Sequence, residues 1–391
     1  MEKKYRIGLF IDNFYPIIDG AIIVVDSISK ILKKSAEIIV FTAAPRNGIY
    51  DDSKLEYKVI RCRSEKIPFV KRIAYDRPVP NKDKEFKRML EESALDLVHI
   101  NSPFAVGEQG LEYAKQHNVP SVITLHSQYK QDFYKATHSR LITAMLMRRI
   151  MKVFNECDEC WSVNEASKQV LYEYGINKEP VTMENGTDMF PVIDRKKAMD
   201  EINKDYNINE KQKVMLFVGR LVTVKNIFFI ADVLKVLKEQ NFDFKMIFIG
   251  DGPAKEELQK KLNEHGIADN VIFTGFIKDR EEIAKFYVRA DLFMFPSFYD
   301  TDGIVKKEAA CQKTPIICAE GSIVAKSVFP DHNAYVAPNN AAAFADKIIK
   351  VFEDPKEYNE ICENAYNELY ITWEKTAKNI LDRYKFLIES Y

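Results

Sequence analysis

The chain of 391 residues is too long for one ordinary hydrophobic core and predicts two domains. Apolar residues make up 46% and charged residues 29% of it, the balance of a soluble globular protein. The formal net charge of −1 argues against a dedicated nucleic-acid-binding protein, so we expect no nucleic-acid partner.

The N-terminal stretch "MEKKYRIGLFIDNFYP" is charged and then reads as a strand, which differs from a signal peptide. No apolar run reaches the ~20 residues that a membrane-spanning helix needs. Cys157 and Cys160 form a C-x-x-C pair without a second pair at zinc spacing, which favours ordinary reduced cysteines. We therefore expect a cytoplasmic protein that meets a membrane, if at all, as a peripheral protein on the inner face of the plasma membrane.

Short apolar runs alternate with helical patterns along the whole chain. The runs of strand length in the first half are residues 5–12, 36–43, 57–62, 95–101 and 120–126, with helical spacing over 27–34 and 108–118. The pattern then restarts, with strands predicted at 214–220, 245–252, 270–276, 290–297 and 314–320 and helices at 227–240, 254–266, 280–290 and 303–312. Near-continuous apolar strands are typical of parallel sheets covered on both faces.

Two successive βαβ series predict an α/β protein with two Rossmann-like domains facing each other across a cleft. A polar turn at 184–197 separates the two series. We expect an N-terminal domain over residues 1–190 and a C-terminal domain over 191–374. The helical stretch at 375–391 is expected to cross back onto the first domain.

The loop "FVGRLVTVKN" follows a predicted buried strand and carries two cations. Arg220 comes directly after Gly219, and Lys225 stands five residues later near a helix start. A guanidinium and an ammonium together suit the oxygens of a diphosphate. The alternative is a pair of solvated surface cations.

The stretch "FYDTDGIVKKEAA" carries acids on both sides of a glycine. Gly303 allows close approach of the backbone, and the N–H groups at the start of the next helix, at Ile304 and Val305, can bind a phosphate. Glu308, one turn further on, can accept both hydroxyls of a ribose. Asp300 lies at the strand end, within reach of sugar hydroxyls. The Asp-Thr-Asp triplet also fits a metal site, which leaves two readings open.

Two loops of the first half offer weaker signals. Gly20 in "YPIIDGA" stands at a helix start without a full G-x-G-x-x-G fingerprint, which disfavours a dinucleotide dehydrogenase. His126 ends a predicted strand, where a structural and a functional histidine are both plausible. A phosphate-binding G-x-x-x-x-G-K motif is absent from the sequence, which disfavours a P-loop NTPase.

Taken in order, these motifs resemble the retaining GT-B glycosyltransferases of the large family-four class, which includes sucrose synthases, bacterial mannosyltransferases and glycolipid synthases. The resemblance covers nearly the whole chain. It comprises the "P…GG" loop at Pro16 and Gly20, "T-x-H" at Thr124 and His126, "NG-x-D" in "ENGTD", "VGRL…KN" from Gly219 to Asn226, "GDGP" at 250–253, and "FPS…E-x7-E" with Asp300 and Glu308.

The resemblance implies transfer of a sugar from a nucleotide diphosphate donor to an acceptor hydroxyl with retention, UDP-sugars being favoured over GDP-sugars. It assigns catalytic roles to Arg220, Lys225, Asp300 and His126. Donor binding falls to Gly20, Gly219, Gly303, Ile304, Val305 and Glu308. It also implies a metal-free site, without a cofactor, in which cations and helix N-termini neutralise the diphosphate.

The chain departs from the family pattern at several positions, which affects the choice of donor sugar. Asp300 replaces the usual first glutamate, Asp302 stands where an apolar residue is common, and Lys313 replaces a glycine. Two other functions remain open: a GT-B nucleotide-sugar epimerase, and a non-catalytic subunit of a glycosylation complex. The first would isomerise donor without acceptor, and the cations and Glu308 argue against the second.

Residues 140–154 are a candidate for contact with an anionic membrane surface. Drawn as a helix, they place Arg140, Arg148, Arg149 and Lys152 in one sector, with Leu141 and Met145 inside it. Such a basic amphipathic helix can lie on anionic lipid, and residues 68–78 add further cations. The alternative is a domain helix with a solvated basic face. The expected acceptor is therefore a lipid or lipid-linked glycan, with a soluble glycan as the alternative.

Overall fold

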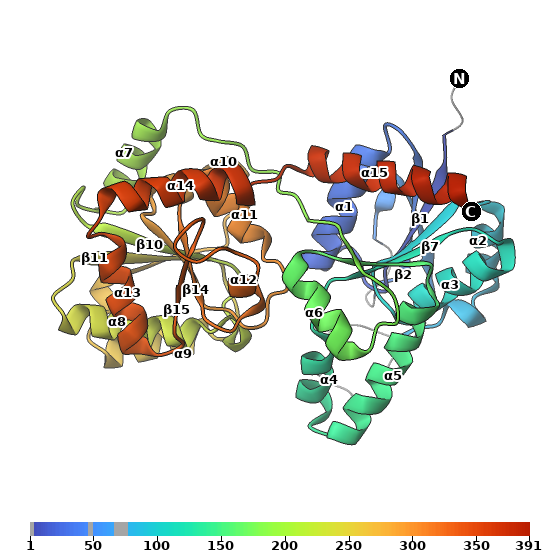
Figure 1. Ribbon diagram of the computed structural model, residues 1–391, viewed down its shortest axis with the longest axis horizontal. Coiled ribbons are helices and arrows are strands. Elements are labelled where there is room, and N and C mark those ends of the chain that lie inside the picture. The colour runs from blue at the N-terminus through green and yellow to red at the C-terminus, as the bar shows by residue number, and fades with distance from the viewer. Residues whose placement is uncertain (1–3, 46–49, 66–76) are drawn as a thin grey trace. The chain divides into compact units, whose positions relative to one another are not determined.

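The computed structural model describes residues 4–45, 50–65 and 77–391 (Figure 1). The chain forms two compact units: Met1–Asn185 with Trp373–Tyr391, and Gly186–Thr372. We refer to them as the first and second units. The expected cations at 68–76 lie outside the described residues.

A seven-stranded parallel sheet forms the centre of the first unit, in the order β3-β2-β1-β6-β7-β8-β9. Its interior strand β1 pairs Ile7 with Ile38 of β2 on one side and with Leu97 of β6 on the other. The side chains are buried on both faces, which is why the strands read as apolar runs. The strands are β1 (Arg6–Phe10), β2 (Glu37–Ala43), β3 (Lys58–Cys62), β6 (Leu97–Ile100), β7 (Ser121–Leu125), β8 (Glu159–Ser162) and β9 (Val181–Thr182), and β4 (Ser64–Glu65) and β5 (Arg77–Pro78) form a separate antiparallel pair.

The last helix of the chain belongs to this unit and packs against its first helix (Figure 1). Tyr384 of that last helix is fully buried and stacks on Trp161 of β8. The helices are α1 (Gly20–Leu32), α2 (Lys84–Glu92), α3 (Ala105–His117), α4 (Tyr129–Thr137), α5 (Arg140–Glu156), α6 (Glu165–Tyr174) and α15 (Trp373–Ser390), with 3₁₀ turns at η1 (Asp52–Lys54) and η2 (Pro80–Lys82).

The second unit repeats the design with a six-stranded parallel sheet in the order β12-β11-β10-β13-β14-β15. Its strands are β10 (Lys213–Val218), β11 (Phe244–Ile249), β12 (Val271–Gly275), β13 (Leu292–Phe295), β14 (Ile316–Ala319) and β15 (Tyr335–Ala337). Its helices are α7 (Arg195–Asp205), α8 (Ile227–Glu239), α9 (Lys255–Glu264), α10 (Arg280–Arg289), α11 (Ile304–Cys311), α12 (Ile323–Lys326), α13 (Ala341–Val351) and α14 (Pro355–Leu369), with 3₁₀ turns at η3 (Thr223–Lys225) and η4 (Ala268–Asn270). Separate hydrophobic clusters cover the two faces of the sheet.

The predicted α/β architecture with two Rossmann-like halves is confirmed. Each strand predicted from an apolar run coincides with a strand of a parallel sheet. The prediction missed β8, β9 and β15, which are two to four residues long. Strands this short carry too few residues for a periodic signal.

Candidate active site

The loops after β10 and β11 are joined through their backbones. The N–H of Gly219 donates to the carbonyl of Ile249 at 2.9 Å, and the N–H of Leu221 donates to that of Asp251 at 2.9 Å. A Cβ on Gly250 would lie 2.0 Å from the carbonyl oxygen of Gly219. Glycine is therefore required at 250 so that the two loops can pack this closely.

Both cations of the first loop are placed at the carboxyl end of β10. Arg220 is exposed, and among the described residues no carboxylate lies within ion-pair distance of it. Lys225 ends η3, and its ammonium forms an ion pair with the Oδ1 atom of Asp300. The structure thus joins two of the predicted catalytic residues across 75 positions of sequence.

Asp300 has one carboxylate oxygen left over. Its Oδ2 atom is buried and has no hydrogen-bond partner within the described part of the chain. Buried carboxylate oxygens normally accept a hydrogen bond, so this atom is suited to accept one from a bound hydroxyl. The Oγ atom of Ser297 holds the Asp300 backbone by accepting from its N–H at 3.4 Å.

Gly303 turns the chain into α11. Its φ of 68° lies in the left-handed region, and a Cβ there would come within 2.3 Å of the Phe295 ring. Ile304 and Val305 follow as the first residues of α11. Since no side chain caps this helix, its first N–H groups are available to an anion.

Glu308 is buried and already holds two partners. Its Oε1 atom forms an ion pair with Arg280 at 2.6 Å, and its Oε2 atom accepts from the Tyr287 hydroxyl at 2.9 Å. Arg280 also pairs with Asp188 at 2.7 Å. Burial lowers the pKa of Arg280, but the two carboxylates outweigh burial, and the guanidinium pKa lies above its ordinary value.

The sequence interpretation missed Arg280 and Tyr287. Arg280 follows the carboxyl end of β12, the same signal that singled out Arg220 after β10. The two residues are seven positions apart on α10 and so lie on one face of it. Together they fix the Glu308 carboxylate from two sides.

The second acid of the Asp-Thr-Asp triplet faces lysines. Asp302 is buried, with its Oδ1 atom 3.6 Å from the ammonium of Lys306 and 3.9 Å from that of Lys307. Both lysines are buried as well. Within the described ranges, no group of three or more acidic, histidine or cysteine side chains is placed to hold a metal ion.

Gly20 and His126 belong to the first unit. Gly20 begins α1, where the Asp19 carboxylate accepts from the N–H of Ile22 at 3.0 Å and so caps the helix. Nothing lies within 4 Å of a Cβ built on Gly20, so packing within the protein does not require glycine there. The Nε2 atom of His126 lies 2.9 Å from the Oδ1 atom of Asn101, which follows β6.

A further buried acid follows β1 and was not singled out from the sequence. Asp12 accepts from the N–H of Val106 at 3.0 Å and from the Ser102 hydroxyl at 2.7 Å. Burial raises its pKa to about 6, although both hydrogen bonds lower it. Asp12 therefore fixes the start of α3 beside the ends of β1 and β6.

Two family models match the chain, each over one unit. The model described as Glycosyltransferase Family 4 matches residues 18–189, and the model described as Glycosyl transferases group 1 matches residues 198–368. The chain belongs to the GT-B glycosyltransferases. Within this glycosyltransferase, the second match contains Arg220, Lys225, Asp300 and Glu308.

Relatives of the enzyme carry the names of glycosyltransferases. It is 27% identical to an alpha-monoglucosyldiacylglycerol synthase of Streptococcus pneumoniae over 80% of this chain and 70% of the relative. It is 25% identical to the enzyme of the same name from Acholeplasma laidlawii, over 92% and 91%. A GDP-mannose-dependent alpha-mannosyltransferase of Corynebacterium glutamicum is 22% identical, over 99% and 90%.

Solved structures share the fold of the enzyme. Sucrose-phosphate synthase from Thermosynechococcus elongatus superposes with a TM-score of 0.80 at 20% identity, covering 99% of this chain and all of that one. HepE of Anabaena, solved in complex with UDP-glucose, superposes with a TM-score of 0.75 at 17% identity, covering 98% of this chain and all of that one. At these identities the likeness establishes the architecture alone.

Proposed function

We propose that the enzyme transfers a sugar from a nucleotide diphosphate donor to a hydroxyl of a lipid or lipid-linked acceptor, with retention at the anomeric carbon. The observation that carries this proposal is the ion pair of Lys225 with Asp300 beside the uncapped start of α11. It places a cation, a carboxylate with an unused oxygen and free N–H groups at one end of one sheet.

The cations act on the leaving group. As the bond between sugar and diphosphate breaks, negative charge grows on the departing oxygens. In this proposal Arg220, Lys225 and the N–H groups of Ile304 and Val305 stabilise that charge as cations and hydrogen-bond donors. When the donor binds, the Lys225 ammonium contacts the diphosphate, and its ion pair with Asp300 weakens.

The carboxylates and His126 bind hydroxyls. Asp300 and His126 hold the hydroxyls of the transferred sugar and fix its reacting face. Glu308 binds the nucleoside ribose through lone pairs that Arg280 and Tyr287 leave unused, since an ionised carboxylate has about four acceptor positions. No side chain is assigned as a covalent nucleophile.

The donor nucleotide is proposed to be UDP. Support comes from HepE, which was solved with UDP-glucose, whereas the relative from Corynebacterium glutamicum is GDP-mannose-dependent. Turnover of a panel of UDP- and GDP-sugars, with vesicles containing diacylglycerol as acceptor, tests donor and acceptor together. An isomerised donor formed without acceptor would instead identify an epimerase, and no turnover of any donor would favour a binding subunit.

The lipid acceptor is supported by the names of the two monoglucosyldiacylglycerol synthases and by the surface of α5. Leu141, Ile142 and Met145 are exposed on that helix, a composition suited to contact with lipid. In the described part of the chain, no helix is both long and apolar enough to cross a membrane. We therefore propose peripheral contact with the cytoplasmic membrane face.

The basic sector predicted on residues 140–154 needs one correction. Arg149 forms two hydrogen bonds of 2.7 Å with the carboxylate of Glu108 on α3. Its charge is therefore compensated within the protein. Arg140 and Arg148 are exposed, and no carboxylate of the described residues lies within ion-pair distance of either.

Transfer is predicted to proceed without a divalent metal. Asp300 faces Lys225 and Asp302 faces Lys306 and Lys307, so each acid of the triplet already has a cation at hand. We expect the initial rate in EDTA to equal the rate in buffer within about twofold, because cations and N–H groups do the work of a metal. Loss of the rate in EDTA, with recovery on adding manganese, would contradict this.

A further inference from the structure

A pocket of about 910 Å³ opens between α4, α5 and α6 of the first unit. This lies within the range of about 300–1,000 Å³ that is usual for small-molecule sites. None of the residues that line it belongs to the predicted catalytic or donor-binding set. The lining residues are Lys130, Tyr134, Arg140, Thr143, Ala144, Met147, Arg148, Met151, Lys152, Asn155, Glu173 and Tyr174.

The pocket carries an excess of positive charge. Four cations line it against a single carboxylate, Glu173. Lys152 lies 3.7 Å from Glu156, but none of the carboxylates in the described ranges comes within ion-pair distance of Lys130, Arg140 or Arg148. Such uncompensated cations around one hollow favour an anionic ligand, and guanidinium groups suit the oxygens of a phosphate.

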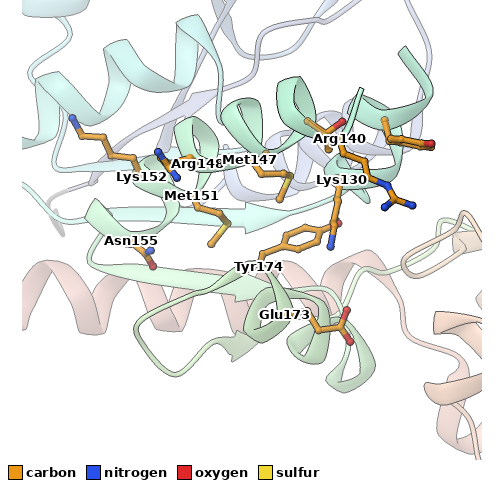
Figure 2. Close-up of a pocket in the computed structure, with 12 residues that line it drawn as sticks. Lys130, Arg140, Met147, Arg148, Met151, Lys152, Asn155, Glu173 and Tyr174 are labelled. Carbon is orange, nitrogen blue, oxygen red and sulfur yellow. The ribbon is translucent and has the colours of Figure 1, made fainter. Parts of the chain in front are cut away.

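The middle of the pocket is apolar. Figure 2 shows Met147 and Met151 pointing from α5 toward the side where Tyr174 of α6 lies. In the same view Lys130 and Arg140 lie toward one end and Lys152 toward the other. Methionine side chains adapt their shape to irregular apolar partners. The ligand that fits therefore has an anionic group and an apolar chain in one molecule.

The exposed apolar residues near the pocket explain how such a molecule would enter. On α5, Leu141 is 74% and Met145 63% exposed, and on α4, Tyr134 is 48% exposed while also lining the pocket. Exposed apolar residues beside cations are suited to the boundary between headgroups and acyl chains. A lipid could pass from that boundary into the pocket without its chain crossing water.

We propose that this pocket binds one molecule of a phosphate-bearing lipid as an accessory site, separate from the position of the reacting acceptor. The phosphate contacts the arginine and lysine side chains, and part of one chain lies against Met147, Met151 and Tyr174. The inference rests on the proposed function, the transfer of sugar to a lipid acceptor at a membrane surface. Beyond general adsorption on an anionic membrane, it assigns a single saturable binding site to the pocket between α4, α5 and α6.

Binding of a short-chain lipid below its micellar concentration tests the site. We would titrate dihexanoyl-phosphatidylglycerol into the full chain by calorimetry, with dihexanoyl-phosphatidylcholine and inorganic phosphate as comparison probes. We expect dihexanoyl-phosphatidylglycerol to bind at one site per chain. Dihexanoyl-phosphatidylcholine and inorganic phosphate should each bind at least tenfold more weakly. Equal affinity for inorganic phosphate would overturn the lipid assignment, and unsaturable binding would overturn the pocket.

Two variants separate the pocket from a charged surface. Arg140→Glu with Arg148→Glu is expected to weaken binding at least tenfold, as two cations near a lipid phosphate should. Met147→Trp keeps every charge but fills the hollow, so the pocket predicts a similar loss, whereas simple electrostatic adsorption predicts none. Unchanged binding in Met147→Trp, with normal thermal unfolding, would overturn the proposal.

A matched control changes the net charge elsewhere. Lys204→Glu with Lys238→Glu alters the same amount of charge at exposed positions of the second unit, and binding should be unchanged. A loss equal to that of the pocket variants would overturn the proposal. These titrations contain no donor, so they test the pocket independently of sugar transfer. Lipid binding in a protein that shows no sugar transfer would contradict the proposed function alone. Sugar transfer by a protein that binds no lipid would contradict the pocket proposal alone.

Discussion

At the scale of single residues, most charged side chains of the candidate donor site are fixed by ion pairs or hydrogen bonds to neighbouring side chains. Lys225 is held by Asp300, and Glu308 is held by Arg280 and Tyr287. Arg220 alone among these has no such partner in the described chain. The geometry of the two carboxylates is therefore set before a ligand arrives, which reduces the cost of ordering them when the donor binds.

Removing either cation should slow the chemical step. We expect Arg220→Ala and Lys225→Ala each to lower kcat by about two to three orders of magnitude, the usual cost of losing one fixed donor to developing charge. Lys238→Ala, on the exposed face of α8, serves as the control and should keep full activity. If kcat fell by less than about tenfold in both variants, the two cations would be ordinary surface residues without a catalytic role.

Changing Glu308 should affect binding more than rate. Glu308→Gln is expected to raise the donor KM more than it lowers kcat, since ribose contacts are similar in the ground and transition states. Tyr287→Phe keeps the carboxylate but removes the hydrogen bond at 2.9 Å, and should raise KM less. Steady-state kinetics with varied donor would decide. A donor KM left unchanged in Glu308→Gln would rule out the ribose contact.

At the scale of elements, three of the candidate side chains follow the carboxyl ends of parallel strands. Arg220 follows β10, Arg280 follows β12 and Asp300 follows β13. In the sheet β13 lies beside β10, and β12 is separated from β10 by β11. Because the strands are parallel, their carboxyl ends lie at one edge of the sheet. The start of α11 then depends on Gly303, which joins β13 to that helix.

Gly303 and Gly266 form a matched pair for testing this turn. Both have a φ of 68°, but a Cβ on Gly266 meets nothing within 4 Å, whereas one on Gly303 would lie 2.3 Å from the Phe295 ring. We expect Gly266→Ala to lower the free energy of unfolding by about 1–2 kcal/mol, the cost of the left-handed region. Gly303→Ala should cost about 1–3 kcal/mol more, because the core is overpacked.

Denaturant unfolding of both variants would measure the difference. Adding Phe295→Leu to Gly303→Ala should recover part of the loss, since the smaller side chain leaves room for the Cβ. Equal destabilisation of the two alanine variants would show that φ alone explains the glycine at 303.

At the scale of the whole molecule, the chain leaves the first unit after Asn185 and returns to it at Trp373. The returning helix α15 is held by a buried network. The His99 ring bonds to the Tyr384 hydroxyl through Nδ1 and lies 2.7 Å from the Thr124 hydroxyl through Nε2. Residues 285 positions apart thus share one hydrogen bond.

This network predicts a loss of stability in acid. Burial, with a smaller effect from His126, lowers the pKa of His99 to about 3. In the unfolded chain His99 is protonated below about pH 6.5, whereas in the folded chain it stays neutral down to about pH 3. The free energy of unfolding therefore falls as the pH is lowered from about 6.5 to 3, by at most about 1.4 kcal/mol per pH unit. His99→Gln should flatten this fall in thermal unfolding measured across that range.

Asp12 provides a contrast of opposite sign. Its pKa is raised to about 6, so its contribution to stability is present below about pH 4 and is lost as the pH rises through 6. Asp12→Asn should therefore make the acid loss steeper, while His99→Gln makes it shallower. Parallel shifts in both variants would show that other groups govern the pH dependence.

The sequence by itself determined the two parallel sheets and the loops that carry the chemistry. Strands buried on both faces must be apolar throughout, and glycines such as Gly250 and Gly303 are required by close contacts and backbone angles. Each of these requirements restricts the residue type at its position, so each leaves a signal in the sequence. The family resemblance rested on the same loops and is confirmed by the two family models.

Only the tertiary structure decided which side chains hold one another. The partners of Glu308 lie 21 and 28 positions away. Arg149 is paired with Glu108 of α3, and His99 with Tyr384 of α15. It also showed that Arg149 is compensated by Glu108, whereas Arg140 and Arg148 line a pocket with methionines. Such pairings depend on distances across the fold, which hydrophobic periodicity along the chain does not encode.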